Sequence, residues 1–365
     1  MGKKSVFIFI CFTLLAASCG RKLEEETKQL IKLFPIEQDG KFGYIDKTGK
    51  IVIKPQFDSA WDYSEGLARV SIDAKYGYID KAGKYVITPQ FVWAFPFSEG
   101  LAPVEIDGKF GYIDKTGKIV IKDDFESALA FSEGLAPVEI GGKWGYIDKT
   151  GKYVIDPQFL WAFPFSEGMA RIEVGGKYGY IDKTGRIVIK PQFDWTLTVF
   201  SEALASIWLG SRYGYMDKRG RYVIDPRLGL AGAFSEGLAC VKIDGKYGYI
   251  NKTGKYVINP QFVYAFPFSE GLARVSVGSK WGYIDKTGKF VINPQFDLAG
   301  DFSEGLARVS VGGKWGYIDK TGKFIINPQF DWAWWGFSEG LASVEVGGKR
   351  GYIDKAGKYI WEPTK

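Results

Sequence analysis

The stretch Lys143–Lys152, KWGYIDKTGK, decides the fold because it returns along most of the chain. The same ten letters stand at 280–289 and 314–323, and weaker copies occur throughout. The glycine after the aromatic residue recurs every 34 residues, apart from two steps of 35, and stands at Gly43, Gly77, Gly111, Gly145, Gly179, Gly214, Gly248, Gly282, Gly316 and Gly351. A fixed period of this length is the signature of a repeat architecture, so ten copies tile residues 33–365.

Each copy predicts three short antiparallel strands, as the fourth copy illustrates. Residues 135–140 alternate apolar and other side chains, which is typical of a half-buried strand. A glycine pair then predicts a two-residue hairpin turn into a second strand at 144–147. The turn Asp148–Gly151 leads to a third strand at 153–155. We expect Pro157 to end this strand, because proline cannot donate to a ladder, and a loop to follow.

The array as a whole is predicted to be all-β, because glycines and prolines interrupt every copy too often for a helical repeat. Ten units exceed the four to eight blades usual for a closed propeller. An open or superhelical array of three-stranded meanders is therefore the favoured expectation, and a closed propeller-like toroid is the alternative. The truncated last copy, with Arg350 in place of the aromatic residue, is expected to meet solvent as a terminal unit.

The N-terminal residues predict export. A basic start and a short apolar run make residues 1–18 a signal peptide, since the run is too short to span a bilayer. The stretch 15–19, LAASC, resembles a bacterial lipobox, which implies that Cys19 carries lipid and that the protein sits at the outer membrane or cell surface. Residues 19–32 are expected to form a tether or a short helical cap before the array at 33–365.

Composition argues against several kinds of function. The chain has no histidine, which removes the commonest general base and metal ligand. Its net charge of +6 is too small and too evenly spread to indicate nucleic-acid binding. We therefore expect no catalysis, no metal and no cofactor. Cys240 stands at a position that varies from copy to copy, so we expect it to be an exposed, unpaired thiol.

The repeat also carries a family resemblance. The sequence KWGYIDKTGK, followed by Pro-Gln-Phe and then Phe-Ser-Glu-Gly-Leu-Ala, resembles the WG repeat of bacterial proteins. The resemblance covers about nine tenths of the chain. It implies the repeat architecture and implies no single activity.

Three recurring columns of residues are interpreted as structural. The aspartate column, including Asp148, suits a turn cap, and Asn251 in the seventh copy can cap equally well but binds hard cations poorly. An aromatic residue such as Trp144 is the largest apolar side chain of its unit, so we expect it to pack in the core. The Ser-Glu-Gly triplet is expected to bond to the backbone at a turn and not to act in catalysis.

The segment after Pro-Gln-Phe varies most between copies and holds the candidate ligand-binding residues. Aromatic residues recur there around an alanine, and two interpretations stay open: packing between repeats, or a ladder of aromatics for a glycan or an extended peptide. The candidates are Trp61, Trp93, Phe95, Trp161, Phe163, Trp195, Tyr264, Phe266, Trp332 and Trp334.

The sequence thus predicts a lipid-anchored envelope or surface scaffold that binds a glycan, peptidoglycan, a peptide or a protein without catalysis. A purely structural envelope protein, or a non-catalytic subunit of an enzyme complex, is the alternative.

Overall fold

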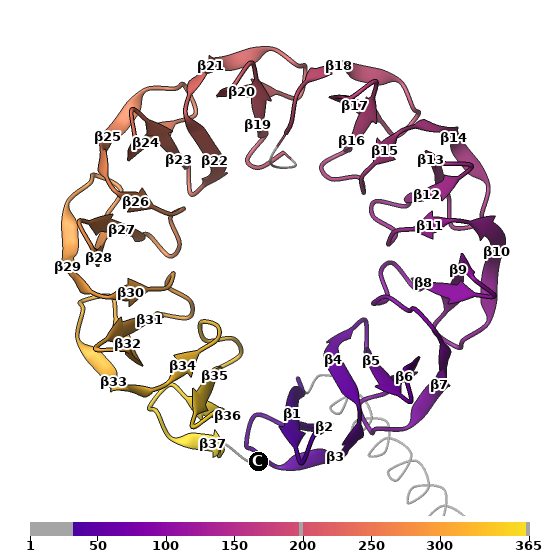
Figure 1. Cartoon of the computed structure of the whole chain (residues 1–365), viewed down its shortest axis with the longest axis horizontal. Helices are drawn as coiled ribbons and strands as arrows, with labels where there is room; N and C mark the ends of the chain where they lie inside the picture. The colour runs from indigo at the N-terminus through magenta and orange to yellow at the C-terminus, as the bar shows by residue number, and fades with distance from the viewer. Residues whose placement is uncertain (1–31, 197–199, 363–365) are drawn as a thin grey trace, which may run out of the picture.

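The computed structural model describes residues 32–196 and 200–362, and every regular element among them is a β-strand. The strands form ten small antiparallel sheets, which Figure 1 shows as blades arranged in a ring. We number the blades 1–10 in chain order.

The strands of the first five blades are as follows. Blade 1 holds β1 (Phe34–Gln38), β2 (Lys41–Ile45) and β3 (Ile51–Phe57); blade 2 holds β4 (Ser59–Ser64), β5 (Leu67–Ile72), β6 (Lys75–Ile79) and β7 (Tyr85–Phe91); blade 3 holds β8 (Leu101–Ile106), β9 (Lys109–Asp114) and β10 (Ile119–Phe125); blade 4 holds β11 (Ser127–Ala128), β12 (Ala136–Ile140), β13 (Lys143–Ile147) and β14 (Tyr153–Phe159); blade 5 holds β15 (Trp161–Ala162), β16 (Met169–Val174), β17 (Lys177–Asp182) and β18 (Ile187–Phe193).

The other five blades repeat this plan. Blade 6 holds β19 (Leu204–Leu209), β20 (Arg212–Asp217) and β21 (Tyr222–Leu228); blade 7 holds β22 (Leu230–Ser235), β23 (Leu238–Ile243), β24 (Lys246–Asn251) and β25 (Tyr256–Phe262); blade 8 holds β26 (Tyr264–Ala265), β27 (Ala273–Val277), β28 (Lys280–Ile284) and β29 (Phe290–Phe296); blade 9 holds β30 (Leu298–Ala299), β31 (Leu306–Val311), β32 (Lys314–Asp319) and β33 (Phe324–Phe330); blade 10 holds β34 (Trp332–Ala333), β35 (Leu341–Val346), β36 (Lys349–Asp354) and β37 (Tyr359–Trp361).

The prediction of three strands per unit was incomplete, because the segment after Pro-Gln-Phe adds a fourth strand to most blades. This strand lies innermost in the ring, and the strand that ends in Pro-Gln-Phe lies outermost (Figure 1). In blades 3 and 6 a single bridge, Ala94↔Val104 or Trp195↔Trp208, takes its place. Each blade therefore begins after the Phe of one Pro-Gln-Phe triplet and ends at the next triplet.

The expectation that proline ends the outer strand was wrong. β14 runs through Pro157 to Phe159, and its pairing with β13 shifts register between Trp144 and Tyr146. Proline is tolerated because it lies in a bulge, where no ladder bond is needed. The bulge folds over Gly145, where a Cβ would lie 2.6 Å from the Ile155 carbonyl oxygen. The glycine that marks the repeat is thus required by a close backbone approach.

The turn-cap interpretation of the aspartate column is confirmed. Asp148 Oδ1 accepts hydrogen bonds from the backbone N–H groups of Thr150 at 2.8 Å and Lys152 at 3.1 Å. Asn251 Oδ1 accepts the equivalent bonds from Thr253 and Lys255, both at 3.0 Å. An amide oxygen and a carboxylate oxygen therefore serve this turn equally well, as a structural role requires.

The hydrophobic core is divided among the junctions between blades. Between blades 4 and 5, for example, Trp144, Tyr146 and Phe159 from one blade pack with Phe165 and Ile172 from the next. Ten such clusters occur among the described residues, one at each junction around the ring. Each blade therefore buries both of its faces only against its neighbours, as expected for a repeat protein.

The ring is closed, so the favoured expectation of an open array was wrong and the propeller-like alternative is the observed fold. At the seam between blades 10 and 1, Phe34 and Ile36 pack with Leu341. The Tyr352 hydroxyl donates to the Pro35 carbonyl oxygen at 2.9 Å. In an open array these apolar faces would meet water, whereas the ring buries both together.

Polar bonds also join each blade to the next. The Tyr146 hydroxyl donates to the Phe163 carbonyl oxygen at 2.8 Å, and the Ser132 hydroxyl donates to the Phe165 carbonyl oxygen at 2.7 Å. The serine of the Ser-Glu-Gly triplet thus bonds to backbone, as expected, but its partner lies in the neighbouring blade. The same bonds recur at most other junctions.

The glutamate of this triplet completes the links between blades. Glu133 accepts a hydrogen bond from the Gly168 N–H at 3.0 Å and pairs with Lys183 at 3.0 Å, and both partners belong to the next blade. Burial would raise the pKa of Glu133, but the bonds from Lys183 and Gly168 outweigh it, so the pKa is lowered. Equivalent ion pairs are Lys115–Glu65, Lys149–Glu99, Lys218–Glu167, Lys252–Glu202, Lys286–Glu236, Lys320–Glu270 and Lys355–Glu304.

Cys240 is buried, with 3% of its surface exposed, so the expectation of an exposed thiol was wrong. Its Sγ donates to the Ala265 carbonyl oxygen of the next blade at 3.2 Å. Arg274 occupies the same position one blade later and donates to the Ala299 carbonyl oxygen. The position varies because side chains of different size fit between two blades there, not because it faces water. Burial raises the pKa of the Cys240 thiol to about 12.

The predicted signal peptide and lipid-attachment residue Cys19 lie outside the described residues, as does nearly all of the predicted tether at 19–32. Within residues 32–196 and 200–362 there is no helix with the length and apolar character needed to span a membrane.

Candidate binding site on the aromatic rim

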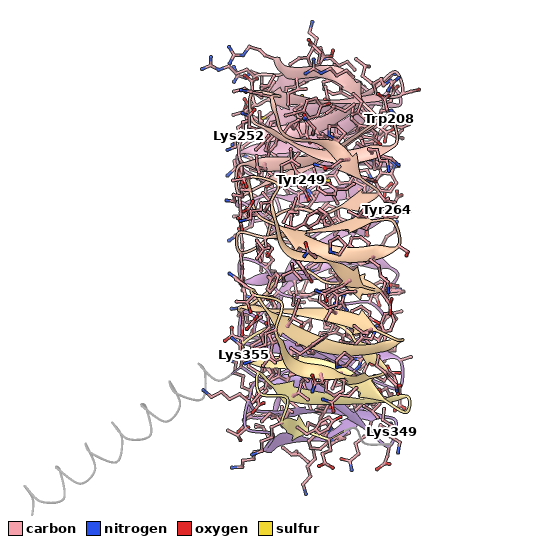
Figure 2. The ribbon with its side chains drawn as sticks, turned by 90° about the vertical axis from the view of Figure 1, so that its left-hand side faces the viewer. Trp208, Tyr249, Lys252, Tyr264, Lys349 and Lys355 are labelled. Atoms are coloured by element: carbon pink, nitrogen blue, oxygen red, sulfur yellow. The ribbon has the colours of Figure 1, made fainter. Side chains whose placement is uncertain are left out.

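The ring has two rims of different chemistry, which Figure 2 shows on opposite sides. Trp208, Tyr264 and Lys349 lie toward one side, and Lys252 and Lys355 lie toward the other (Figure 2). We call the first side the aromatic rim and the second the lysine rim. Lys252 and Lys355 on the lysine rim belong to the Glu–Lys ion pairs that link the blades, so a glutamate already balances each of these charges.

Five of the ten predicted binding residues form one set on the aromatic rim. They occupy equivalent positions beside the innermost strand of their blades, at the place of Tyr264 in Figure 2. They are exposed by 54% (Trp93), 50% (Trp161), 37% (Trp195), 53% (Tyr264) and 42% (Trp332). Large aromatic side chains are seldom left this exposed, and a row of them on one rim is typical of a binding surface.

The other five predicted residues lie two positions further along and are less available. Phe95 is 36% exposed, whereas Trp61, Phe163, Phe266 and Trp334 are half-buried. Arginine guanidinium groups cover most of these rings: Arg69 lies 4.0 Å from the centre of Trp61, Arg171 3.7 Å from Phe163, Arg274 3.6 Å from Phe266 and Arg350 4.5 Å from Trp334. This second column is mainly packing between blades, which was the other interpretation of the pattern.

Lysines at the hairpin turns add charge to the aromatic rim. In most blades a lysine directly follows the hairpin turn that leads into the strand with the repeat glycine. Its pairing depends on the residue just before the innermost strand or bridge of the next blade. Where that residue is aspartate, an ion pair forms: Lys41–Asp58, Lys177–Asp194, Lys280–Asp297 and Lys314–Asp331. Where it is apolar, as at Val92, Leu160 and Val263, the lysine has no acidic partner among the described residues.

Some exposed residues of the aromatic rim escaped the sequence analysis. Trp335 is the most exposed large apolar side chain described, at 73%, and it lies in the segment 331–336, which holds the one extra residue of the 35-residue step between Gly316 and Gly351. Val174 and Val277, exposed by 44% and 49%, precede the hairpin turns of their blades. The extra residue in the segment 331–336 was the feature of the sequence that could have pointed to Trp335. The valines were missed because their positions follow the ordinary strand pattern.

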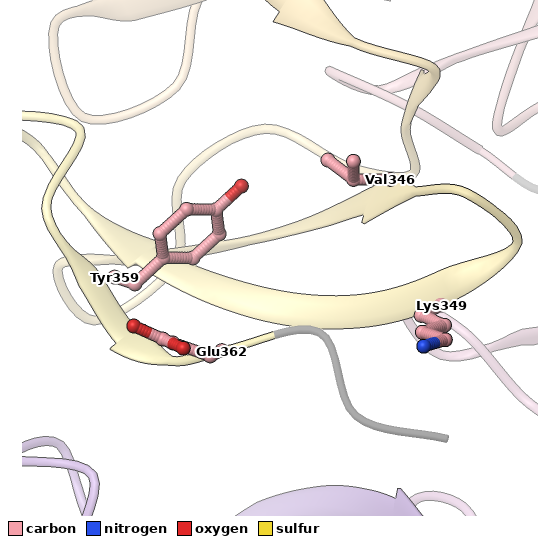
Figure 3. Close-up of a pocket in the computed structure, with 4 residues that line it drawn as sticks. All are labelled: Val346, Lys349, Tyr359 and Glu362. Carbon is pink, nitrogen blue, oxygen red and sulfur yellow. The ribbon is translucent and has the colours of Figure 1, made fainter.

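A hollow marks the seam side of blade 10. Val346, Lys349, Tyr359 and Glu362 line it, and Figure 3 shows Lys349 at the hairpin turn, Tyr359 on the outer strand β37 and Glu362 just after that strand. Nowhere among the described residues do three potential metal-ligating side chains gather.

The arrangement defines a class of protein: a ten-bladed β-propeller whose blades are sequence repeats. The "WG containing repeat" model matches nine times, at residues 42–76, 76–110, 110–144, 144–178, 178–207, 213–247, 247–281, 281–315 and 315–349. The chain therefore belongs to the WG-repeat family, and the resemblance noted from the sequence is confirmed.

The chain is also similar to solved structures at low sequence identity. A eukaryotic initiation factor matches with a TM-score of 0.52 and 11% identity, over 80% of this chain and 94% of its own, and this likeness concerns the fold alone. Two other structures are more distant. BamB from Moraxella catarrhalis has a TM-score of 0.36 and 11% identity, over 80% of this chain and 92% of its own. Hsv2 from Kluyvelomyces marxianus has a TM-score of 0.36 and 11% identity, over 65% of this chain and 97% of its own. A comparison with curated protein sequences found no match.

Proposed function

We propose that this protein is a non-catalytic binding scaffold whose ligand, a glycan, docks on the aromatic rim. The observation that carries the proposal is the set of exposed rings at Trp93, Trp161, Trp195, Tyr264 and Trp332, which occupy equivalent positions in five blades. An exposed aromatic face attracts the C–H face of a sugar ring through dispersion and weak C–H contacts. A repeated platform suits a repetitive ligand, because several weak contacts combine along one chain.

The fold supports a scaffold role in a second way. Each blade is fixed to its neighbours by an apolar cluster and by the Tyr, Ser and Glu bonds, and Trp161, Tyr264 and Trp332 sit on the innermost strands of such blades. Rigid platforms lose little conformational entropy when a ligand binds. A stiff ring with a variable rim is therefore suited to presenting a binding surface.

The test uses the purified protein on an array of glycans and peptidoglycan fragments. Trp93→Ala, Trp161→Ala and Tyr264→Ala together should reduce binding at least tenfold, because half-exposed platforms are lost while the midpoint of thermal unfolding changes little. Val52→Ala, Val120→Ala and Val154→Ala, on the outer strands and each about 40% exposed, form the matched control. If the aromatic variant binds as the wild type does, the rim is not the binding site. If it unfolds, these rings serve packing.

We also propose that the protein is exported and held at the bacterial cell envelope by lipid on Cys19, with residues 1–18 removed. The basis is the lipobox-like stretch at 15–19. More than one acyl chain is needed for a stable anchor, at about 0.8 kcal/mol per buried methylene. Labelling with a radioactive fatty acid should mark the wild type and spare Cys19→Ala. Equal labelling of both proteins would refute the anchor.

A further inference from the structure

The blade junctions of the aromatic rim are not equivalent, and the difference concerns both charge and ring geometry. Junctions 2–3, 4–5 and 7–8 carry the platforms Trp93, Trp161 and Tyr264, each preceded by an apolar residue. Junctions 5–6 and 9–10 carry Trp195 and Trp332, each preceded by an aspartate. We call the first group open junctions and the second group paired junctions.

The platforms of the open junctions lie nearly flat on the ring beneath them. Trp161 stacks on Trp144 at 5.7 Å with an interplanar angle of 23°, and Trp93 stacks on Tyr76 at 6.3 Å and 17°. Tyr264 is tilted by 33° against Tyr247 at 6.2 Å and also stacks on Trp281 of its own blade at 6.1 Å and 18°. The preceding blade thus covers one face of Trp93 and of Trp161, whereas Tyr264 contacts two rings, and about half of the surface of each platform remains exposed. A ring held in this way presents its second face to a ligand.

The platforms of the paired junctions stand edge-on instead. Trp195 meets Tyr178 at 80°, and Trp332 meets Trp315 at 64°. Both are less exposed than the three open platforms, at 37% and 42%. An edge-on ring offers less flat surface for stacking, so these two junctions are the weaker candidates for sugar binding.

The lysines at the hairpin turns also differ between the open junctions and the paired junctions. At paired junctions 5–6 and 9–10, Lys177 bonds to Asp194 and Lys314 to Asp331 at the position just before the platform. At open junctions the equivalent lysines are Lys75, Lys143 and Lys246. All three are exposed and have no acidic partner among the described residues. Each is also the chain neighbour of the ring that stacks under the platform.

Acidic groups also lie near the platforms. Glu173 pairs across the strand with Trp161 and is only 9% exposed, whereas the half-buried Glu105 donates its backbone N–H to the Trp93 carbonyl oxygen. Asp73 and Asp244 are exposed in the turns before Lys75 and Lys246. Tyr264 pairs with Ser276, which carries no charge, and Lys242 lies 5.2 Å from the centre of Tyr247 below it. An incoming ligand at these junctions therefore meets an exposed aromatic ring beside an accessible ammonium group.

We infer that the three open junctions are subsites for sugar units that carry an anionic group, either a carboxylate or a phosphate. The sugar ring stacks on Trp93, Trp161 or Tyr264, and its anionic group binds the unpaired lysine of the preceding blade. A charge-assisted hydrogen bond to an ammonium group is stronger than a neutral one, so the lysine selects acidic polymers over neutral ones. This inference rests on the proposed glycan-binding function and names its ligand class.

The test measures affinity for three polymers: polygalacturonate, its carboxyl-reduced neutral form, and poly(glycerol phosphate). The wild type should bind at least one anionic polymer ten times more tightly than the neutral one, and the preferred polymer identifies the anionic group. Lys75→Gln, Lys143→Gln and Lys246→Gln together should abolish this preference. The control variant, with Lys41→Gln, Lys177→Gln and Lys314→Gln, removes equal charge from ion pairs on the same rim and should keep the preference.

Two results would overturn the inference: a wild type that prefers neither anionic polymer, or equal losses in the two lysine variants, which would indicate general charge attraction. Failure of the proposed function looks different. In that case the variant lacking the Trp93, Trp161 and Tyr264 rings would bind all three polymers as the wild type does. Thermal unfolding of the lysine variants should match that of the wild type, since the substituted side chains are exposed.

Discussion

The closure of the ring makes a sharp prediction for Ile36 at the seam. Ile36 is 3% exposed and packs between blades 1 and 10. Ile172 occupies the same position in blade 5 and is fully buried between blades 4 and 5. Substitution of a buried isoleucine by alanine costs roughly 2–5 kcal/mol, whereas an exposed one changes stability by at most about 0.5 kcal/mol. We expect Ile36→Ala and Ile172→Ala each to lower the free energy of unfolding by about 3 kcal/mol.

The assay is urea unfolding followed by both circular dichroism and tryptophan fluorescence, so that a single transition can be verified. Ile172→Ala reports an ordinary blade junction and serves as the matched control. If Ile36→Ala leaves stability within about 0.5 kcal/mol of the wild type while Ile172→Ala does not, Ile36 faces water and the ring is open. If neither variant loses stability, the assignment of the core to the blade junctions is refuted.

Three further predictions concern the polar links and Cys240. Glu133 has a lowered pKa in the folded state, so the stability from its pair with Lys183 is present above the ordinary pKa of 4.5 and is lost as the pH falls below it. In Glu133→Gln the free energy of unfolding should therefore depend less on pH in that acid range, and an unchanged pH dependence would contradict this. Asp148→Asn should be nearly neutral in thermal unfolding, whereas Asp148→Ala should cost about 0.5–2 kcal/mol, and equal losses would refute the cap. Cys240 should react with a thiol reagent only on unfolding, and rapid labelling of the native protein would show that it is not buried.

Local structure was largely predictable from the repeat because local chemistry fixes it. Asp148 and Asn251 predicted a capped turn, and the alternation of apolar and other residues at 135–140 predicted a strand. The structure shows both the capped turn and the paired strand. The outer strand was predicted to be too short, because proline was expected to end it. Pro157 cannot donate to a regular ladder, but the bulge in this strand accommodates it. Sequence alone did not show that the outer strand folds back over Gly145.

Closure depends on packing between blades, which strand periodicity does not encode. Small angles between successive blades must add to a full turn, and no residue specifies that sum. One signal was nonetheless present: the first copy carries apolar Phe34 and Ile36 on the face that an open array would expose. The prediction for Cys240 was wrong because a position that varies between copies was expected to be exposed, whereas Cys240 and the arginines of this column bond to the backbone of the next blade.

The candidate site was predictable as a set of positions but not as a geometry. The sequence identified the variable segment and its aromatic residues, including Trp161 and Trp195. It did not reveal that Trp161 lies flat while Trp195 stands edge-on, or that Asp194 pairs with Lys177 of the preceding blade. The division of the rim into open and paired junctions therefore required the structure.

Hydroxyl-radical footprinting tests most directly whether the ligand binds on the aromatic rim. The protein is oxidised with and without a saturating acidic polymer, and side-chain oxidation is read by mass spectrometry. We expect Trp93, Trp161 and Tyr264 to become protected while Tyr222, 41% exposed on the outer strand β21, reacts unchanged. Protection of Tyr222 with no change at the three rim residues would show that the polymer binds elsewhere.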